Sequence, residues 1–211
     1  MAMKDRMHTG ALYLPGDDEI MDRQQLCLDR LYEFNHTRPT EMDKRRALMK
    51  EMFAELGENC YIEPPFYSNF GGAHVHLGNH VYCNFAVTMV DDTHIYIGDN
   101  TMIAPNVTIA TAGHPVLPKL REYDYQYNMP VRIGRTCWIG AGAVILPGVT
   151  VGDNTVIGAG SVVTKDIPPN VVAVGNPCRV LRPIDDRDKK YYFRDHPIDH
   201  AQIAQDLEEN K

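Results

Sequence analysis

The chain has no long apolar run and no clustered cysteines. None of its 211 residues belongs to a stretch of the roughly 18 apolar residues that a membrane helix needs, and the start of the chain lacks a secretory signal pattern. The five cysteines show no CxxC or similar metal-ligand spacing; they are Cys27, Cys60, Cys83, Cys137 and Cys178. We therefore expect a cytoplasmic protein with free, buried thiols and no membrane partner.

An excess of basic residues is also missing. Lys and Arg number 21 against 28 Asp and Glu, so the formal net charge is −7. This balance argues against general nucleic-acid binding. It still allows a local basic patch that would hold an anionic cofactor.

What the chain does have is an aliphatic residue at every sixth position through much of its length. The residue that follows is often Gly, Ala or Asn. A period of six fits neither an α-helix nor a long strand, and it is typical of a parallel β-helix built from hexapeptides. The aliphatic side chains would stack in the interior, while the turns favour Gly, Asn and Asp. The register comprises Leu77, Cys83, Met89, Ile97, Ile103, Ile109, Ile133, Ile139, Ile145, Val151, Ile157 and Val163.

The repeat divides the chain into three parts. Residues 1–58 lack it and have helical patterns at residues 21–34 and 40–57, the second with Thr40 as its N-terminal cap and Gly57 as its C-terminal cap. Residues 59–180 form the β-helix domain. Residues 181–211 are highly charged, and we expect a C-terminal extension there.

One segment inside the repeat does not look like coil. Residues 113–129 are rich in proline and tyrosine, which predicts a loop extruded from the β-helix. Loops on a rigid scaffold often carry function. His114, held between Gly113 and Pro115, is a candidate general base because an imidazole titrates near neutral pH. The competing interpretation is an ordinary surface histidine, one of nine in the chain.

The chain resembles the galactoside and maltose O-acetyltransferases of the hexapeptide-repeat acyltransferases. The strings that carry the resemblance run nearly end to end and include "YEFNHTRPTE", "IEPPFY", "NFAVTMVDD", "IGDNTMIAPNVTI", "GHPV" and "DRDKKYYF". The resemblance implies that the β-helix is left-handed. It also implies a homotrimer and transfer of acetyl from acetyl-CoA to a sugar hydroxyl, usually the 6-OH of a glycoside, without a metal.

The same resemblance assigns roles to individual residues. His114 matches the catalytic histidine, which would take the proton as the sugar hydroxyl attacks the thioester directly. A backbone N–H near Ala141 would stabilise the oxyanion. No Cys or Ser stands beside His114 in the sequence to suggest a covalent route.

The sugar-contacting positions are expected from both the resemblance and their side-chain chemistry. Asn and Asp provide directional hydrogen bonds, although at a coil corner they also serve turns. The N-terminal segment departs from the family pattern, because Pro15 stands at the expected acidic place. Either Asp17 or Asp18 replaces the acid and Arg23 the arginine after it, or these charges are ordinary solvated groups around the start of a helix. The candidate acceptor-binding residues are Asn84, Asp92, Tyr82, Asp17, Asn69 and Gln126.

The cofactor side is expected along the coil. Trp138 is the only tryptophan and lies outside the inward register, which fits either a packing residue between subunits or, as the resemblance implies, a residue beside the pantetheine arm of CoA. The small residues near it would let an extended pantetheine approach the backbone. Basic side chains suit the adenosine phosphates. The candidate residues for binding acetyl-CoA are Trp138, Ala141, Ala159, Thr164, Lys165, Arg179 and Arg182.

Three other classes are compatible with the same fold. A γ-type carbonic anhydrase would need a histidine five residues after His114, where Lys119 stands. A structural or ice-binding coil would show repeated Thr faces, which are not seen. A xenobiotic acetyltransferase of the chloramphenicol type shares the coil and a loop histidine, and it is the serious alternative. Such enzymes generally lack the N-terminal segment that carries "FNHTRPTE".

Overall fold

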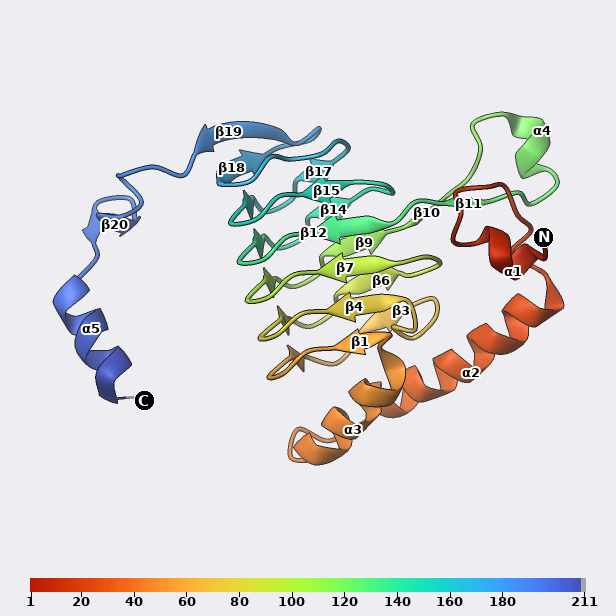
Figure 1. The fold of residues 1–211 in the computed structure, drawn as a ribbon, viewed down its shortest axis with the longest axis horizontal. Helices are drawn as coiled ribbons and strands as arrows, with labels where there is room; N and C mark the ends of the chain where they lie inside the picture. Colours follow the sequence, from red (N-terminus) through yellow and green to blue (C-terminus); the bar gives the residue numbers. More distant parts are fainter. Residues whose placement is uncertain (210–211) are drawn as a thin grey trace.

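The computed structural model describes residues 1–209 and shows a three-sided parallel β-helix with helices at one end and an arm at the other (Figure 1). The first face holds β1 (Glu55–Leu56), β4 (Val75–Leu77), β7 (Ile95–Ile97), β12 (Val131–Ile133) and β15 (Thr150–Val151). The second holds β2 (Tyr61–Ile62), β5 (Tyr82–Cys83), β8 (Met102–Ile103), β13 (Trp138–Ile139), β16 (Val156–Ile157), β18 (Val171–Val174) and β19 (Arg179–Pro183). The third holds β3 (Tyr67–Ser68), β6 (Thr88–Val90), β9 (Thr108–Ala110), β14 (Val144–Ile145) and β17 (Val162–Val163).

The hexapeptide register forms the core, as predicted. Ile103, Ile109, Ile139, Ile145 and Ile157 are fully buried, and the rest of the register is at most 3% exposed. Burying one such side chain contributes about 1.5–3 kcal/mol, so the stack of equivalent residues is the main stabilising feature of the coil. Strands of successive coils pair in parallel and in register, as Ile139 does with Ile103 and Ile157.

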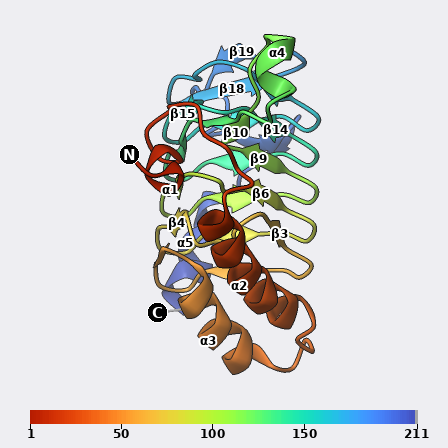
Figure 2. The ribbon, with the colours of Figure 1, turned by 90° about the vertical axis from the view of Figure 1, so that its right-hand side faces the viewer.

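The N-terminal helices cover the first coil. α1 spans Met3–Arg6, α2 spans Asp18–Asn35 and α3 spans Met42–Met52. α2 and α3 lie across the end of the β-helix next to β1 and β3 (Figures 1 and 2). Phe34, Leu48 and Met52 join the core of the coil, so these helices close its apolar end.

The predicted helix at 21–34 is confirmed with slightly wider bounds, but both predicted ends of the next helix are wrong. Glu41, not Thr40, occupies the N-cap of α3, and no side chain caps it. The Glu41 carboxylate instead accepts a hydrogen bond from the backbone N–H of Arg38 at 2.7 Å. α3 ends at Met52, and Gly57 packs against the backbone of Gly78 in the next coil, so the β-helix begins upstream of residue 59.

The remaining elements project from the β-helix. β10 (Ala112–Gly113) pairs antiparallel with β11 (Tyr127–Asn128) and flanks the short helix α4 (Pro118–Arg121). After β19, an arm carries β20 (Tyr191–Phe193), β21 (His196–Pro197) and α5 (His200–Glu209), with no buried residue in these elements (Figure 1). Within residues 1–209, no helix is both long and apolar enough to cross a membrane.

Candidate active site

The loop of residues 113–129 leaves the coil between the third and first faces, and its base is closely packed. Gly113 lies opposite Tyr127 in the β10–β11 ladder, where an added Cβ would come within 2.9 Å of the Tyr127 ring. Only glycine fits this approach without displacing the tyrosine. The position of the next residue, His114, is therefore set by the ladder rather than by the loop tip.

His114 is exposed, and one of its ring nitrogens is held by the loop. Its Nδ1 lies 3.0 Å from the backbone oxygen of Tyr125. A carbonyl oxygen only accepts hydrogen bonds, so in the neutral ring Nδ1 carries the hydrogen and Nε2 keeps a free lone pair. This is the tautomer that a general base acting through Nε2 needs.

A cavity of about 230 Å³ beside the loop gathers three of the predicted acceptor residues. The Asp92 carboxylate accepts hydrogen bonds from Asn69 Nδ2 at 2.8 Å and from Gln126 Nε2 at 2.9 Å. Asp92 is 5% exposed, so the two amides hold its carboxylate in one orientation at the cavity wall. A polar group fixed in this way suits recognition of a sugar hydroxyl.

Sequence reasoning missed two residues of this cavity's polar network, Tyr13 and Asn128. Tyr13 is fully buried, and its backbone exchanges two hydrogen bonds with that of Gln126, each at 3.0 Å. Asn128 Nδ2 donates to the backbone oxygen of Met7 and to the Tyr13 hydroxyl. Burial raises the pKa of Tyr13 to about 12. No local sequence pattern predicts these contacts of Tyr13 and Asn128, because they form only when the N-terminal segment docks on the loop.

The other predicted acceptor residues lie apart from this cavity. Asp17 occupies the N-cap of α2 without a side-chain cap bond, and it does not line the cavity. Tyr82 is on β5 of the second face, stacked at 6.2 Å on Tyr61. Asn84 follows β5, and its Oδ1 accepts from the N–H of Phe85, which is a turn contact.

The candidate cofactor residues follow the second face and its corner with the third. Trp138 is 56% exposed on β13, between Met102 and Val156 in the ladder. Ala141 and Ala159 are exposed at stacked corners, and within residues 1–209 their backbone N–H groups have no hydrogen-bond partner. Free amides on a smooth corner are suitable donors for a carbonyl oxygen.

The remaining candidate residues are divided between two sides of the β-helix. Thr164 and Lys165 are exposed after β17, at the corner between the third and first faces, which is also the corner where the loop leaves the coil. Arg179 donates to the backbone oxygen of Cys178 at 2.7 Å. Arg182 is already engaged, since its guanidinium forms two hydrogen bonds with Asp188 at 2.6 and 2.7 Å and lowers the pKa of that carboxyl to about 2. Contact between Arg182 and a phosphate would therefore have to compete with Asp188.

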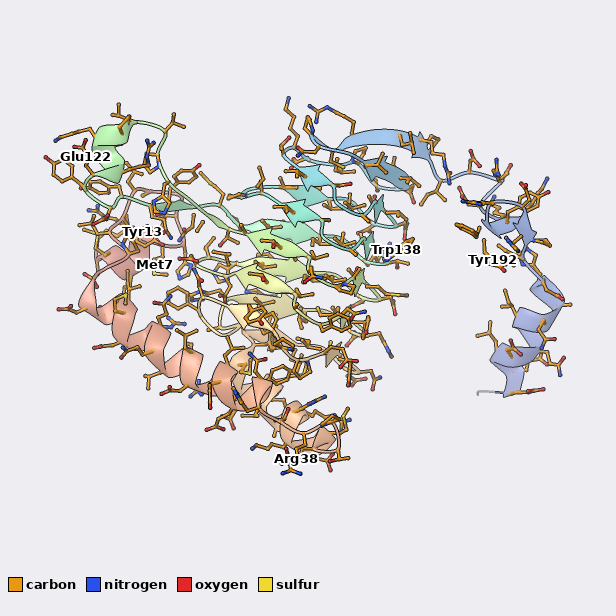
Figure 3. The ribbon with its side chains drawn as sticks, turned by 180° about the vertical axis from the view of Figure 1, so that it is seen from behind. Met7, Tyr13, Arg38, Glu122, Trp138 and Tyr192 are labelled. Atoms are coloured by element: carbon orange, nitrogen blue, oxygen red, sulfur yellow. The ribbon has the colours of Figure 1, made fainter. Side chains whose placement is uncertain are left out.

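One chain places the two halves of the candidate site on opposite sides of the β-helix. Tyr13 and Glu122 mark the loop side and Trp138 the other side (Figure 3). The chain path gives the same result, because the loop leaves at the corner of the third and first faces, whereas Ala141 lies at the corner of the second and third. The loop histidine and the row of free amides of one chain therefore do not face each other.

Comparison with family models defines the class. Residues 6–57 match the maltose acetyltransferase hexapeptide capping motif, and residues 130–165 match the bacterial transferase hexapeptide, which has six repeats. The capping motif covers the helical segment that closes the coil here. The fold and both matches place the chain among the hexapeptide-repeat transferases.

Comparison with individual proteins narrows the class. The chain is 51% identical to galactoside O-acetyltransferase of Escherichia coli (strain K12) over 94% of this chain and 98% of that protein. It is 53% identical to galactoside O-acetyltransferase of Lactococcus lactis over 92% of this chain and 94% of that protein. A solved structure of galactoside acetyltransferase in complex with coenzyme A superposes with a TM-score of 0.91 at 51% identity, covering 94% of this chain and 99% of that one. The chain belongs to the galactoside O-acetyltransferase family, which confirms the resemblance found in the sequence.

Proposed function

We propose that this protein is an acetyl-CoA-dependent O-acetyltransferase acting on a hydroxyl of a galactoside or related glycoside. The observation that carries the proposal is the match at 51–53% identity, over more than nine-tenths of the chain, to two galactoside O-acetyltransferases. The coenzyme A complex of a relative with the same fold supports the cofactor. The polar cavity around Asp92 suits a sugar acceptor.

In the proposed mechanism, His114 acts as the general base. Nε2 takes the proton of the sugar hydroxyl while its oxygen attacks the thioester carbonyl carbon. The Tyr125 carbonyl at Nδ1 keeps the ring in the required tautomer and stabilises the imidazolium that forms. The same imidazolium then returns its proton to the departing CoA sulfur as the C–S bond breaks.

The backbone N–H of Ala141 is the proposed oxyanion donor. It has no partner within residues 1–209, so it would be available when negative charge develops on the carbonyl oxygen. A fixed donor of this kind contributes about 3–4 kcal/mol to the transition state in comparable sites. Asp92, Asn69 and Gln126 would position the sugar, with Trp138 and Ala159 beside the pantetheine arm and Thr164, Lys165, Arg179 and Arg182 near the phosphates.

We further propose a homotrimer located in the cytoplasm. The separation of His114 from Ala141 within one chain supports an assembly in which neighbouring β-helices complete each site. Closed three-fold symmetry suits a three-sided prism that packs side by side. All five cysteines are free thiols, which supports a reducing compartment.

The test is CoA release from acetyl-CoA with galactosides, glucosides, maltose and chloramphenicol as acceptors. We expect turnover on a glycoside and a fall of at least about a hundredfold in His114→Ala, because a general base contributes that much or more. The matched control is His36→Ala. His36 is also exposed with Nδ1 against a backbone oxygen, that of Tyr32, but lies at the far end of α2.

Three outcomes would contradict parts of the proposal. Turnover on chloramphenicol with none on any sugar would favour the xenobiotic alternative. Full activity in His114→Ala would show that His114 is not the general base. Equal losses in His114→Ala and His36→Ala would indicate a general effect on folding instead of chemistry.

A further inference from the structure

The cavity of about 230 Å³ around Asp92 is called the acceptor cavity below. A second cavity, of about 190 Å³, lies next to it and shares Ile20 and Phe70 with it. We call it the histidine cleft. Its floor is buried and mostly apolar, and its rim is exposed and charged. The cleft is lined by Met7, Ile20, Phe70 and His74 on the floor and by Lys4, His8, Glu19 and Arg23 at the rim.

The floor contains an imidazole that lacks one partner. His74 is 3% exposed, and its Nδ1 lies 2.6 Å from the backbone oxygen of Asp91. Because that carbonyl can only accept, Nδ1 carries the hydrogen. Burial lowers the pKa of His74 to about 4, so the ring is neutral at pH 7 and Nε2 has a bare lone pair.

This second ring nitrogen is unsatisfied. Nε2 is buried and has no hydrogen-bond partner within residues 1–209. His74 lines the cleft together with His8 of the N-terminal segment, and the two rings meet edge-on with their centroids 4.8 Å apart. Buried polar atoms are normally paired, so an unpaired acceptor beside a cavity marks a place for a donor from outside the chain.

The rim provides one unpaired positive charge. Lys4 is paired with Glu19, whereas Arg23 has no ion pair with any residue in 1–209. Burial is the main cause that lowers the pKa of His8 and of His74, and the nearby charge of Arg23 lowers both further. His8 is itself held by Thr93, whose Oγ1 lies 2.9 Å from its Nδ1. Within the same residues, no group of His, Cys, Asp and Glu has the arrangement of a metal site, so a metal does not explain the cluster.

We propose that the histidine cleft binds a small 2-hydroxycarboxylate. Its carboxylate would pair with Arg23, its hydroxyl would donate to His74 Nε2, and its short hydrocarbon part would rest on Phe70 and Ile20. A plain carboxylate can only accept hydrogen bonds, so it would leave Nε2 unpaired. Inorganic phosphate carries an O–H as well, but it has no apolar part to place on the floor.

The test uses ¹⁵N-histidine-labelled full-length protein titrated at pH 7.5 with L-lactate, propionate and inorganic phosphate, while the His74 Nε2 resonance is followed. Propionate is lactate without the hydroxyl. We expect saturable shifts with lactate and about tenfold weaker binding of propionate, which corresponds to one lost hydrogen bond. Phosphate is also expected to bind more weakly than lactate.

A variant and its control test whether the carboxylate of the ligand pairs with Arg23. Arg23→Gln is expected to weaken lactate binding about tenfold, since a charge-assisted contact is lost. Arg30→Gln is the matched control: Arg30 is also exposed on α2 but faces Glu51 at 3.9 Å. It is expected to bind lactate as the native chain does.

Several results would overturn the proposal. Equal affinity for lactate and propionate would show that the hydroxyl makes no contact that matters for binding. Lactate binding that leaves the His74 Nε2 resonance unchanged would place the ligand elsewhere. Displacement of lactate by a glycoside acceptor would make the cleft an extension of the acceptor cavity, and no response to any probe would leave it a solvent-filled cleft.

Discussion

Two histidines in this protein make the same hydrogen bond and differ in exposure. His114 and His74 each place Nδ1 against a backbone carbonyl, so each neutral ring presents a bare Nε2. His114 is exposed on the loop, where that nitrogen is accessible to a substrate. His74 is buried, and desolvation lowers its pKa to about 4. The chemistry proposed for His114 and the binding proposed for His74 both follow from where the same side chain is placed.

The low pKa of His74 predicts that the fold weakens in acid. The unfolded chain protonates this histidine near pH 6.5, whereas the folded chain does so only near pH 4. Its contribution to stability is therefore full above pH 6.5 and is lost progressively as the pH falls toward 4, by up to about 3 kcal/mol. Urea unfolding from pH 7.5 to 4.5 should show this loss in the native chain and a smaller loss in His74→Gln.

His8 and His94 reinforce this effect, because burial also lowers their pKa values. Asp91 acts in the opposite direction, since burial raises its pKa and protonation relieves a buried charge. The difference between the native and His74→Gln profiles isolates His74, with His36→Gln as the exposed control. Parallel profiles for native chain and His74→Gln would contradict the assignment.

Asp92, in the wall of the acceptor cavity, is a second residue whose substitution has a predictable effect. Asp92 accepts from two amide groups, and Asn in its place would set an NH₂ group against one of them. Asp92→Asn is expected to lower kcat/KM for the glycoside about tenfold or more, from a lost hydrogen bond and a facing donor. KM for acetyl-CoA should stay unchanged, so a parallel rise in both KM values would count against a role in acceptor binding.

At the scale of elements, the coil and the helices differ in how well the sequence predicts them. The six-residue spacing identified the core of every strand in its register because each residue of the register meets the equivalent residue of the next coil. The ends of α3 were not predictable from its local pattern. Residues 55–57 are recruited by pairing of β1 with β4, far along the chain, and that tertiary pairing ends the helical pattern early.

The stacking of coils predicts which glycines are essential. An added Cβ at Gly98 would come within 2.5 Å of the backbone nitrogen of Arg135, which cannot move without disturbing the next coil. Gly98→Ala is expected to destabilise the protein by about 1–3 kcal/mol, as overpacking does. Gly16→Ala is the matched control, because no atom lies within 4 Å of the new Cβ. Equal unfolding midpoints in urea for the two variants would contradict this account.

At the scale of the whole molecule, the candidate site was only partly predictable. Asn69, Asp92 and Gln126, which the resemblance assigns to acceptor binding, line one cavity, but the resemblance gave no sign that Tyr13 and Asn128 hold it together. Their burial depends on contact between segments more than a hundred residues apart. The separation of His114 from Ala141 is likewise a property of the three faces and not of any local string.

This separation predicts complementation between inactive variants. Ala141→Pro removes the free N–H at a corner where the stacked position of the preceding coil already holds Pro105, so the backbone should tolerate it. His114→Ala and Ala141→Pro should each be inactive. If neighbouring chains share sites in a trimer, an equal mixture that assembles at random should regain activity at about a quarter of all its sites, which is about one site in each mixed trimer.

The measurement is acetyl transfer after the two variants are unfolded and refolded together, with each variant refolded alone as control. Absence of any regained activity in assemblies shown to be mixed would mean that one chain completes its own site.

The last strand of the β-helix also affects whether another copy of the chain can extend the stack of coils. The other neighbouring strands on the second face pair in parallel, but β19 runs antiparallel to β18, with a shift in register between Val172 and Ala173. An open parallel edge is a template on which another copy can continue the stack, so uncapped solenoids tend to grow into fibres. Here the reversed strand covers the edge of the second face at one end, and α2 and α3 cover the other end (Figure 1). The protein is thereby protected from end-to-end polymerisation, while its sides remain available for lateral assembly.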